Sequence, residues 1–144
     1  MTSVGTAPAG SSLAVDASVI VALLVDQGPA GAWAVTQCQG HRLIAPSLLT
    51  YEVANVLRRQ LRAGLIGADR ARAAHRAAVE LRVDLWPYRG IAERVWALRD
   101  TLTSYDASYC AVAELAKVRL VTLDSKLAMA SGPLCEIRVF GPSG

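Results

Sequence analysis

Short apolar runs alternate with longer segments of helical periodicity along most of the chain, and this alternation limits the possible folds more than any other feature. The predicted strands are 12–16, 41–46, 83–87, 118–124 and 135–140. The predicted helices are 17–26, 28–39, 47–64, 67–82, 88–102, 104–116 and 125–130. Strands separated by helices need crossover connections and favour parallel pairing. We therefore expect a three-layer α/β fold, in which helices flank a mainly parallel sheet of about four to five strands.

Local signals mark the ends of several predicted helices. Pro29 suits a first helical turn, Ser47 is a candidate N-cap, and Gly64 is a candidate stop. In the helix 104–116, residues at helical spacing predict one apolar face made of Tyr105, Tyr109, Val112 and Ala116.

The length of 144 residues suits one domain with a single core, and 53% of the residues are hydrophobic. We expect a domain over 13–140, a flexible tail over 1–12 and a short tail over 141–144. No apolar run approaches the roughly 18 residues of a membrane span, and the first residues lack the pattern of a secretory signal. These features predict a cytoplasmic protein without a membrane partner.

Cysteine and histidine offer little chemistry. Cys38, Cys110 and Cys135 are widely spaced, which argues against a zinc site or a disulfide framework. Cys110 falls inside a predicted buried helix, where a small core residue is expected. The two histidines, His41 and His75, have no acidic neighbour in sequence, which disfavours catalysis built on histidine.

The chain carries a net charge of +3, from 13 arginines and two lysines against 12 acids. A basic protein is compatible with a polyanionic partner such as nucleic acid, although a preference for arginine can also reflect genomic base content. The arginines concentrate on two predicted helices, at Arg58, Arg59, Arg62, Arg70, Arg72 and Arg76. They fit phosphate contacts, a solvated helix face or an edge that binds a protein partner.

Two predicted strands end in aspartate, at Asp16 and Asp124. Ligands of such folds bind outside the carboxyl ends of the strands, so both carboxylates are candidate site residues. Each also precedes a helix and fits an ordinary N-cap. The two interpretations are compatible, because a capping carboxylate keeps lone pairs for a cation.

Two further acids lie on or beside apolar helix faces. Glu52 shares its face with Leu48, Leu49 and Val56, where an unpaired carboxylate is costly; a salt bridge to Arg58, Arg59 or Arg62 is the alternative to a functional role. Asp106 falls in a first helical turn capped by Thr103 or Ser104. The helix dipole favours an acid there but does not explain its place beside the apolar face.

Four carboxylates that converge on one place repel one another by roughly 4 kcal/mol per pair at 4 Å and an effective dielectric constant near 20. Hard divalent cations such as Mg²⁺ or Mn²⁺ relieve this repulsion and prefer oxygen ligands. Such a site suits hydrolysis of a phosphodiester by metal-activated water. Thr122, Ser18 and Asn55 are candidate hydrogen-bonding supports, although packing or capping explains them equally well.

The motifs resemble those of the PIN domain, and most closely those of VapC-type toxins from bacterial toxin–antitoxin pairs. The resemblance runs from about Leu13 to Phe140 and is carried by LAVDASVIVALL, APSLLTYEVANVLRR, LTSYDASYCAVAELAKVRLVTLDSKL and CEIRVF. The family's acidic quartet corresponds to Asp16, Glu52, Asp106 and Asp124. The departure is the tail before the first strand, which is longer than usual for the family.

The resemblance implies a Mg²⁺- or Mn²⁺-dependent endoribonuclease that cuts structured RNA, such as tRNA or ribosomal RNA, and leaves a 5′-phosphate and a 3′-hydroxyl. It also implies a homodimer and a VapB-type antitoxin whose C-terminal segment fills the active groove. Apolar residues fit either that groove or the core, namely Leu23, Leu24, Trp33 and Val56, and the tryptophans Trp33, Trp86 and Trp96 fit base stacking or the core.

Asp16, Asp106 and Asp124 are the candidate direct or water-mediated metal ligands. Glu52 either binds a second metal ion or orients the attacking water. A phosphatase of the haloacid dehalogenase type is disfavoured, because Ser18 stands where that chemistry needs a second aspartate. The remaining alternative is a non-catalytic RNA- or protein-binding PIN module.

Overall fold

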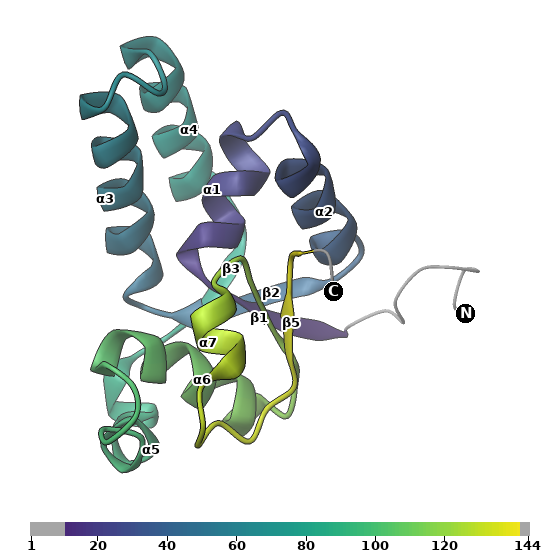
Figure 1. Cartoon of the computed structure of the whole chain (residues 1–144), viewed down its shortest axis with the longest axis vertical. Coiled ribbons are helices and arrows are strands. Elements are labelled where there is room, and N and C mark those ends of the chain that lie inside the picture. Colours follow the sequence, from purple (N-terminus) through teal and green to yellow (C-terminus); the bar gives the residue numbers. More distant parts are fainter. Residues whose placement is uncertain (1–10, 142–144) are drawn as a thin grey trace.

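The computed structural model describes residues 11–141, and its centre is one parallel sheet of five strands in the order β3-β2-β1-β4-β5 (Figure 1). All four neighbouring strand pairs are parallel. The strands are β1 (Ser12–Val15), β2 (Arg42–Pro46), β3 (Val83–Trp86), β4 (Leu120–Thr122) and β5 (Ile137–Val139). The predicted α/β fold and its parallel sheet are confirmed.

The crossover helices cover both faces of this sheet. In chain order they are α1 (Ala17–Val25), α2 (Pro29–Cys38), α3 (Leu49–Arg62), α4 (Ala68–Glu80), α5 (Ala92–Ala97), α6 (Ser104–Ala116) and α7 (Ser125–Met129). Helix α1 packs against α2, α3 and α4, whereas α6 packs against β1, β2 and α5. Figure 1 shows the α3–α4 hairpin standing beside α1, with α5 and α6 at the opposite end of the molecule.

The core lies between the sheet and helices α1 and α6. Leu13, Ala14 and Val15 of β1 are fully buried, and every residue of α6 from Ala107 to Ala113 is buried. A central parallel strand is covered on both faces, so it has no polar alternation. The predicted apolar face of α6 is correct for Tyr109 and Val112 but wrong for Tyr105, which is exposed because the first turn precedes the helix's entry into the core.

The start of α3 differs from the sequence prediction, whereas its end agrees with it. Ser47 does not cap α3, whose N-cap is Leu48 without a side-chain hydrogen bond. The reason is that the Ser47 N–H still bonds to the Trp86 carbonyl at 2.9 Å, as a continuation of the sheet. Gly64 does end this helix: it has φ +75°, and the N–H groups of Gly64 and Leu65 bond to the carbonyls of Leu61 and Gln60.

The predicted helix over 88–102 is broken. A short 3₁₀ turn, η1 (Tyr88–Gly90), is followed by α5, which ends at Ala97. Gly90 disfavours a continuous helix, and the buried Ile91 begins the second piece, where its side chain enters the core.

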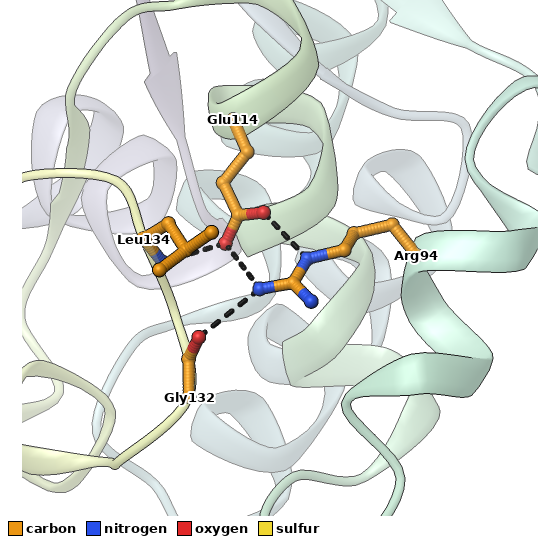
Figure 2. A network of polar contacts seen from close by, with 4 residues as sticks. All are labelled: Arg94, Glu114, Gly132 and Leu134. Carbon is orange, nitrogen blue, oxygen red and sulfur yellow. Dashed lines mark hydrogen bonds and ion pairs between the residues drawn. The ribbon is translucent and has the colours of Figure 1, made fainter.

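A hydrogen-bonded ion pair fixes the segment that leads into β5 (Figure 2). Arg94 Nε donates to Glu114 Oε1 at 2.6 Å, and Arg94 Nη2 donates to the Gly132 carbonyl at 3.0 Å. The Leu134 N–H donates to Glu114 Oε2 at 2.7 Å. One carboxylate of α6 and one guanidinium of α5 therefore hold the chain between α7 and β5.

The predicted terminal tails fall mostly outside the described residues, which exclude 1–10 and 142–144. Strand β1 begins at Ser12, the last residue of the predicted N-terminal tail. Cys38, Cys110 and Cys135 are free thiols, and Cys110 is fully buried as expected. Between residues 11 and 141 no single helix is long and apolar enough to cross a membrane; α1 and α2 meet the criteria only together, with a bend of 113°.

Candidate active site

The four predicted carboxylates, Asp16, Glu52, Asp106 and Asp124, line one cleft of about 270 Å³ at the carboxyl end of the sheet. We call it the acidic cleft. It is completed by Ala17, Ser18, Asn55, Val56, Arg59 and Tyr109. Asp16 follows β1 and Asp124 follows β4, and these strands are direct neighbours. Helices α3 and α6 supply Glu52 and Asp106 from their first turns.

Asp16 is the most enclosed of the four, with 8% of its surface exposed. Its Oδ1 accepts hydrogen bonds from the Ser18 hydroxyl at 2.5 Å and the Val19 N–H at 3.2 Å, and its Oδ2 accepts one from the Thr122 hydroxyl. Burial raises the pKa of Asp16, and these three hydrogen bonds oppose that rise. Asp16 therefore caps α1 and faces the cleft at the same time, as the sequence allowed.

Two hydroxyl groups join the ends of β1 and β4 beneath the cleft. Ser18 Oγ donates to Asp16 and accepts the Leu123 N–H at 3.0 Å. Thr122 Oγ1 donates to Asp16 and accepts the Asp124 N–H at 2.9 Å. The proposed supporting roles of Ser18 and Thr122 are thus present in the structure. Asp124 in turn caps α7, because its Oδ1 accepts the Lys126 N–H at 2.9 Å.

Glu52 is half-buried and is held by a residue that the sequence did not single out for the site. The Tyr109 hydroxyl donates to Glu52 Oε1 at 2.5 Å. Burial and the neighbouring Glu52 carboxylate raise the pKa of Tyr109, so the phenol stays a donor. The alternative salt bridge is absent: none of the ion pairs within residues 11–141 includes Glu52. The one available signal was the position of Tyr109, one turn after Asp106 on the same helix.

Asp106 reaches the acidic cleft from the first turn of α6. Its N–H bonds to the Thr103 hydroxyl at 3.2 Å, which identifies Thr103 as the cap of α6. Burial raises the pKa of Asp106, and the charges of Asp124 and Glu52 raise it further. The carboxylates are therefore close enough to repel one another without an intervening cation.

The donor set of the cleft fits a hydrated hard cation. All four acids offer oxygen, the ligand atom that Mg²⁺ and Mn²⁺ prefer. In the part of the chain that the structure describes, no three acidic, histidine or cysteine side chains are placed to hold one ion together. Mg²⁺ usually keeps several of its water molecules and uses only one or two protein carboxylates, so this spacing suits an ion bound partly through water.

The arginines divide between the cleft and other surfaces. Arg59 lines the acidic cleft and is the one arginine of its lining. Arg70 Nη2 instead donates to the Val25 carbonyl. Arg72 and Arg76 line a hollow on α4 together with Asp69 and Glu80. Most of the predicted basic residues therefore lie away from the acids, whereas Asn55 lies among them.

An apolar groove of about 510 Å³ adjoins the acidic cleft and shares Ser18 and Val56 with it. It is formed by α1, α3 and the loop before α4, with Val21, Val25, Gln60, Leu65, Ile66 and Arg70 in its wall. Of the residues predicted for such a groove, Val56 lines it. Leu23, Leu24 and Trp33 pack against the core, as does Trp86, whereas Trp96 is exposed on α5.

Comparison with known proteins agrees with this architecture. A family model described as PIN domain matches residues 13–132. Ribonuclease VapC9 of Mycobacterium tuberculosis is 36% identical over 127 residues, which is 88% of this chain and 97% of that protein. Ribonuclease VapC1 of the same organism is 42% identical over 96 residues, 66% of this chain and 72% of that protein.

A solved structure shows the same fold. The crystal structure of PAE2754 from Pyrobaculum aerophilum superposes with a TM-score of 0.63 and 26% sequence identity, covering 90% of this chain and 84% of that one. The family match contains all four carboxylates of the acidic cleft. The chain therefore belongs to the PIN-domain family and, within it, to the VapC type.

Proposed function

We propose that this protein is the toxin of a type II toxin–antitoxin pair and acts as a metal-dependent endoribonuclease on structured RNA. The observation that carries the proposal is the convergence of Asp16, Glu52, Asp106 and Asp124 on one cleft. Similarity to proteins named as VapC ribonucleases supports RNA as the substrate. A cytoplasmic location follows from that role.

Each residue of the cleft has a separate task in this proposal. Asp16, Asp106 and Asp124 would hold Mg²⁺ or Mn²⁺ directly or through water, and the hydroxyls of Ser18 and Thr122 orient Asp16 and favour its ionised form. The bound ion would polarise the phosphate and lower the pKa of an attacking water.

Glu52 has one oxygen fixed by Tyr109, which leaves the other to orient a water or to bind a second ion. Arg59 lines the cleft at its edge and contacts an RNA phosphate. If water attacks the phosphorus and the P–O3′ bond breaks, the 3′-oxygen leaves as a hydroxyl and the products carry a 5′-phosphate and a 3′-hydroxyl.

The apolar groove is the proposed binding site of a VapB-type antitoxin. It opens beside the acidic cleft and carries Val21, Val25 and Ile66 in its wall, with Arg70 at its edge. An amphipathic helix would bury its apolar face there and block access to the acids. The similarity to VapC proteins supports this partner, and we propose in addition that the protein is a homodimer.

The experiment uses purified protein freed of antitoxin, a labelled structured RNA, and Mg²⁺ or EDTA. Asp106→Asn should keep the fold and abolish cleavage, because it removes one charge from the metal-binding set. The matched control is Asp100→Asn, an exposed acid just before α6, which should cut at the wild-type rate. Cleavage that persists in EDTA, or in Asp106→Asn, would contradict the proposed chemistry.

The outcome also separates the enzyme from a non-catalytic binding module. A binding module would retain RNA in a gel shift but cut none of it, even with Mn²⁺ present. Sequencing the 5′ ends that arise in cellular RNA after induction would test whether tRNA or ribosomal RNA is the target.

A further inference from the structure

A second concave surface, with an unusual aromatic lining, lies beside the acidic cleft. It has a volume of about 280 Å³ and is lined by Tyr51, Tyr88 and Tyr105 together with Pro46, Leu48 and Ile91. We call it the tyrosine cleft. Three serines, Ser47, Ser104 and Ser108, complete its wall, and no charged residue lines it.

The three tyrosine rings are available to a ligand. Their exposed fractions are 79% for Tyr51, 53% for Tyr88 and 58% for Tyr105. In the described chain their hydroxyls make no hydrogen bond, and the one aromatic pair joins Trp33 to Phe140. Burying such rings in a mutual stack or in the core would have stabilised the fold, so their exposure in one hollow indicates a binding role.

The tyrosine cleft and the acidic cleft share no lining residue but are lined by neighbouring residues of the same two helices. Tyr51 directly precedes Glu52 on α3, and Tyr105 directly precedes Asp106 on α6. Ser108 likewise precedes Tyr109, which holds Glu52. Because successive residues of a helix point about 100° apart, the same two first turns present carboxylates to one cleft and aromatic rings to the next.

We propose that the tyrosine cleft is a subsite for one unpaired nucleobase of the RNA, next to the phosphate that is cut. Aromatic side chains stack on splayed-out bases wherever proteins recognise single-stranded or looped RNA. Pockets that hold small organic ligands have volumes from about 300 Å³ upward. The tyrosine cleft, at about 280 Å³, is close to this lower limit and suits one planar base. The uncharged lining excludes a phosphate and leaves the serine and tyrosine hydroxyls for the base edges.

This inference rests on RNA being the substrate, but its test needs no cleavage. The probe is a ten-nucleotide uridine oligonucleotide with one central 2-aminopurine, whose fluorescence falls when it stacks. Every protein carries Asp106→Asn so that the RNA stays intact in Mg²⁺. In that background, binding should quench the probe, and the triple substitution Tyr51→Leu, Tyr88→Leu and Tyr105→Leu should remove the quenching and weaken binding roughly five- to a hundredfold.

Two controls make the result specific. Replacement of the same tyrosines by phenylalanine keeps the rings and should preserve quenching, and this variant decides the matter if the leucine variant fails to fold. Trp96→Leu removes an aromatic residue that is 66% exposed and lines neither cleft, and it should change nothing.

Three results would overturn the subsite: no quenching in the starting background, unchanged quenching and affinity in the leucine variant, or loss of quenching in the phenylalanine variant. Light scattering supplies a fourth, because a leucine variant that turns a dimer into a monomer would show that a second copy of the chain covers the cleft. Quenching without any RNA cleavage by the wild-type protein would instead refute the nuclease and leave the tyrosine cleft as a base-binding site.

Discussion

Replacing Thr122 by valine tests whether the buried hydroxyl beneath the acidic cleft stabilises an ionised Asp16. Thr122 is fully buried, and its Oγ1 both donates to Asp16 Oδ2 and accepts the Asp124 N–H at 2.9 Å. Valine has nearly the same shape, so the change removes the two hydrogen bonds without leaving a cavity. It is therefore a test of polar energetics alone.

The magnitude follows from the two bonds. A hydrogen bond to a charged group contributes about 1.5–3 kcal/mol, and the Asp124 N–H can recover part of its loss from water because Asp124 is half-buried. We expect Thr122→Val to lower the free energy of unfolding by about 2–3 kcal/mol at pH 7 in EDTA. In urea this is a midpoint shift of about 1–1.5 M with an unchanged slope.

The loss should depend on pH, because the Thr122 hydroxyl lowers the pKa of Asp16. Without that bond the folded-state pKa of Asp16 is higher still, so the variant loses more stability as the pH rises and Asp16 ionises. The difference from wild type should therefore shrink at pH 4. It should also shrink at pH 7 in an Asp16→Asn background, where no charge is present to stabilise. A difference below about 0.5 kcal/mol at pH 7, or one that is equal in both backgrounds, would refute the reasoning.

Three further predictions concern the cleft and the ion pair of Figure 2. Burial holds the pKa of Asp16 above its ordinary value of 3.8, so the folded state loses stability as the pH rises through that window. Asp16→Asn should thus be more stable than wild type at pH 7 in urea but inactive on RNA; lower stability would contradict this. Tyr109→Phe removes the hydrogen bond to Glu52. It should slow cleavage about tenfold and lower the free energy of unfolding by about 1–2 kcal/mol; an unchanged cleavage rate would show that Tyr109 has no role in the site. Arg94→Ala leaves the Glu114 carboxylate, whose side chain is 10% exposed, without its partner. It should lower the free energy of unfolding by about 2–3 kcal/mol, and Glu114→Gln should lower it by less. A decrease below about 1 kcal/mol for Arg94→Ala would show that the ion pair is dispensable.

The sheet was predictable because a short, continuous apolar run in the sequence is typical of a buried strand. β1 and β4 are buried on both faces and read as continuous apolar segments in the sequence. One failure lies where a long-range contact overrides a local preference. Ser47 is a residue type that often caps helices, yet its N–H donates a hydrogen bond to the carbonyl of Trp86, 39 residues later in the chain. The broken helix over 88–102 has a local cause instead, because Gly90 disfavours helix although the apolar periodicity continues through it.

The candidate site was predictable chiefly because one of its acids, Glu52, stands at a position with no structural need for a carboxylate, whereas Asp16 and Asp124 also serve as helix caps. Glu52 on an apolar face was informative for that reason, because a carboxylate there requires a partner. The partner itself was not predictable: Tyr109 fits the same helical stripe whether its ring serves only the core or its hydroxyl also reaches Glu52. Because a tyrosine has an apolar ring and a polar hydroxyl, it occupies the same position in the apolar pattern whether or not its hydroxyl makes a functional contact.

Two of the three cleft aspartates, Asp16 and Asp124, are each hydrogen-bonded to a hydroxyl two residues away in sequence. In the segment Asp16–Ser18, and again in the segment Thr122–Asp124, the hydroxyl accepts an N–H from the end of β4 and donates to Asp16. Each hydroxyl thereby both donates and accepts a hydrogen bond, and the two donated bonds orient the Asp16 carboxylate. The groups that link the two strand ends are the same groups that oppose the rise in the pKa of the buried Asp16 carboxyl. The same hydrogen-bond network therefore serves the fold and the proposed chemistry. A substitution that weakens this network should change both the pH dependence of stability and the rate of RNA cleavage.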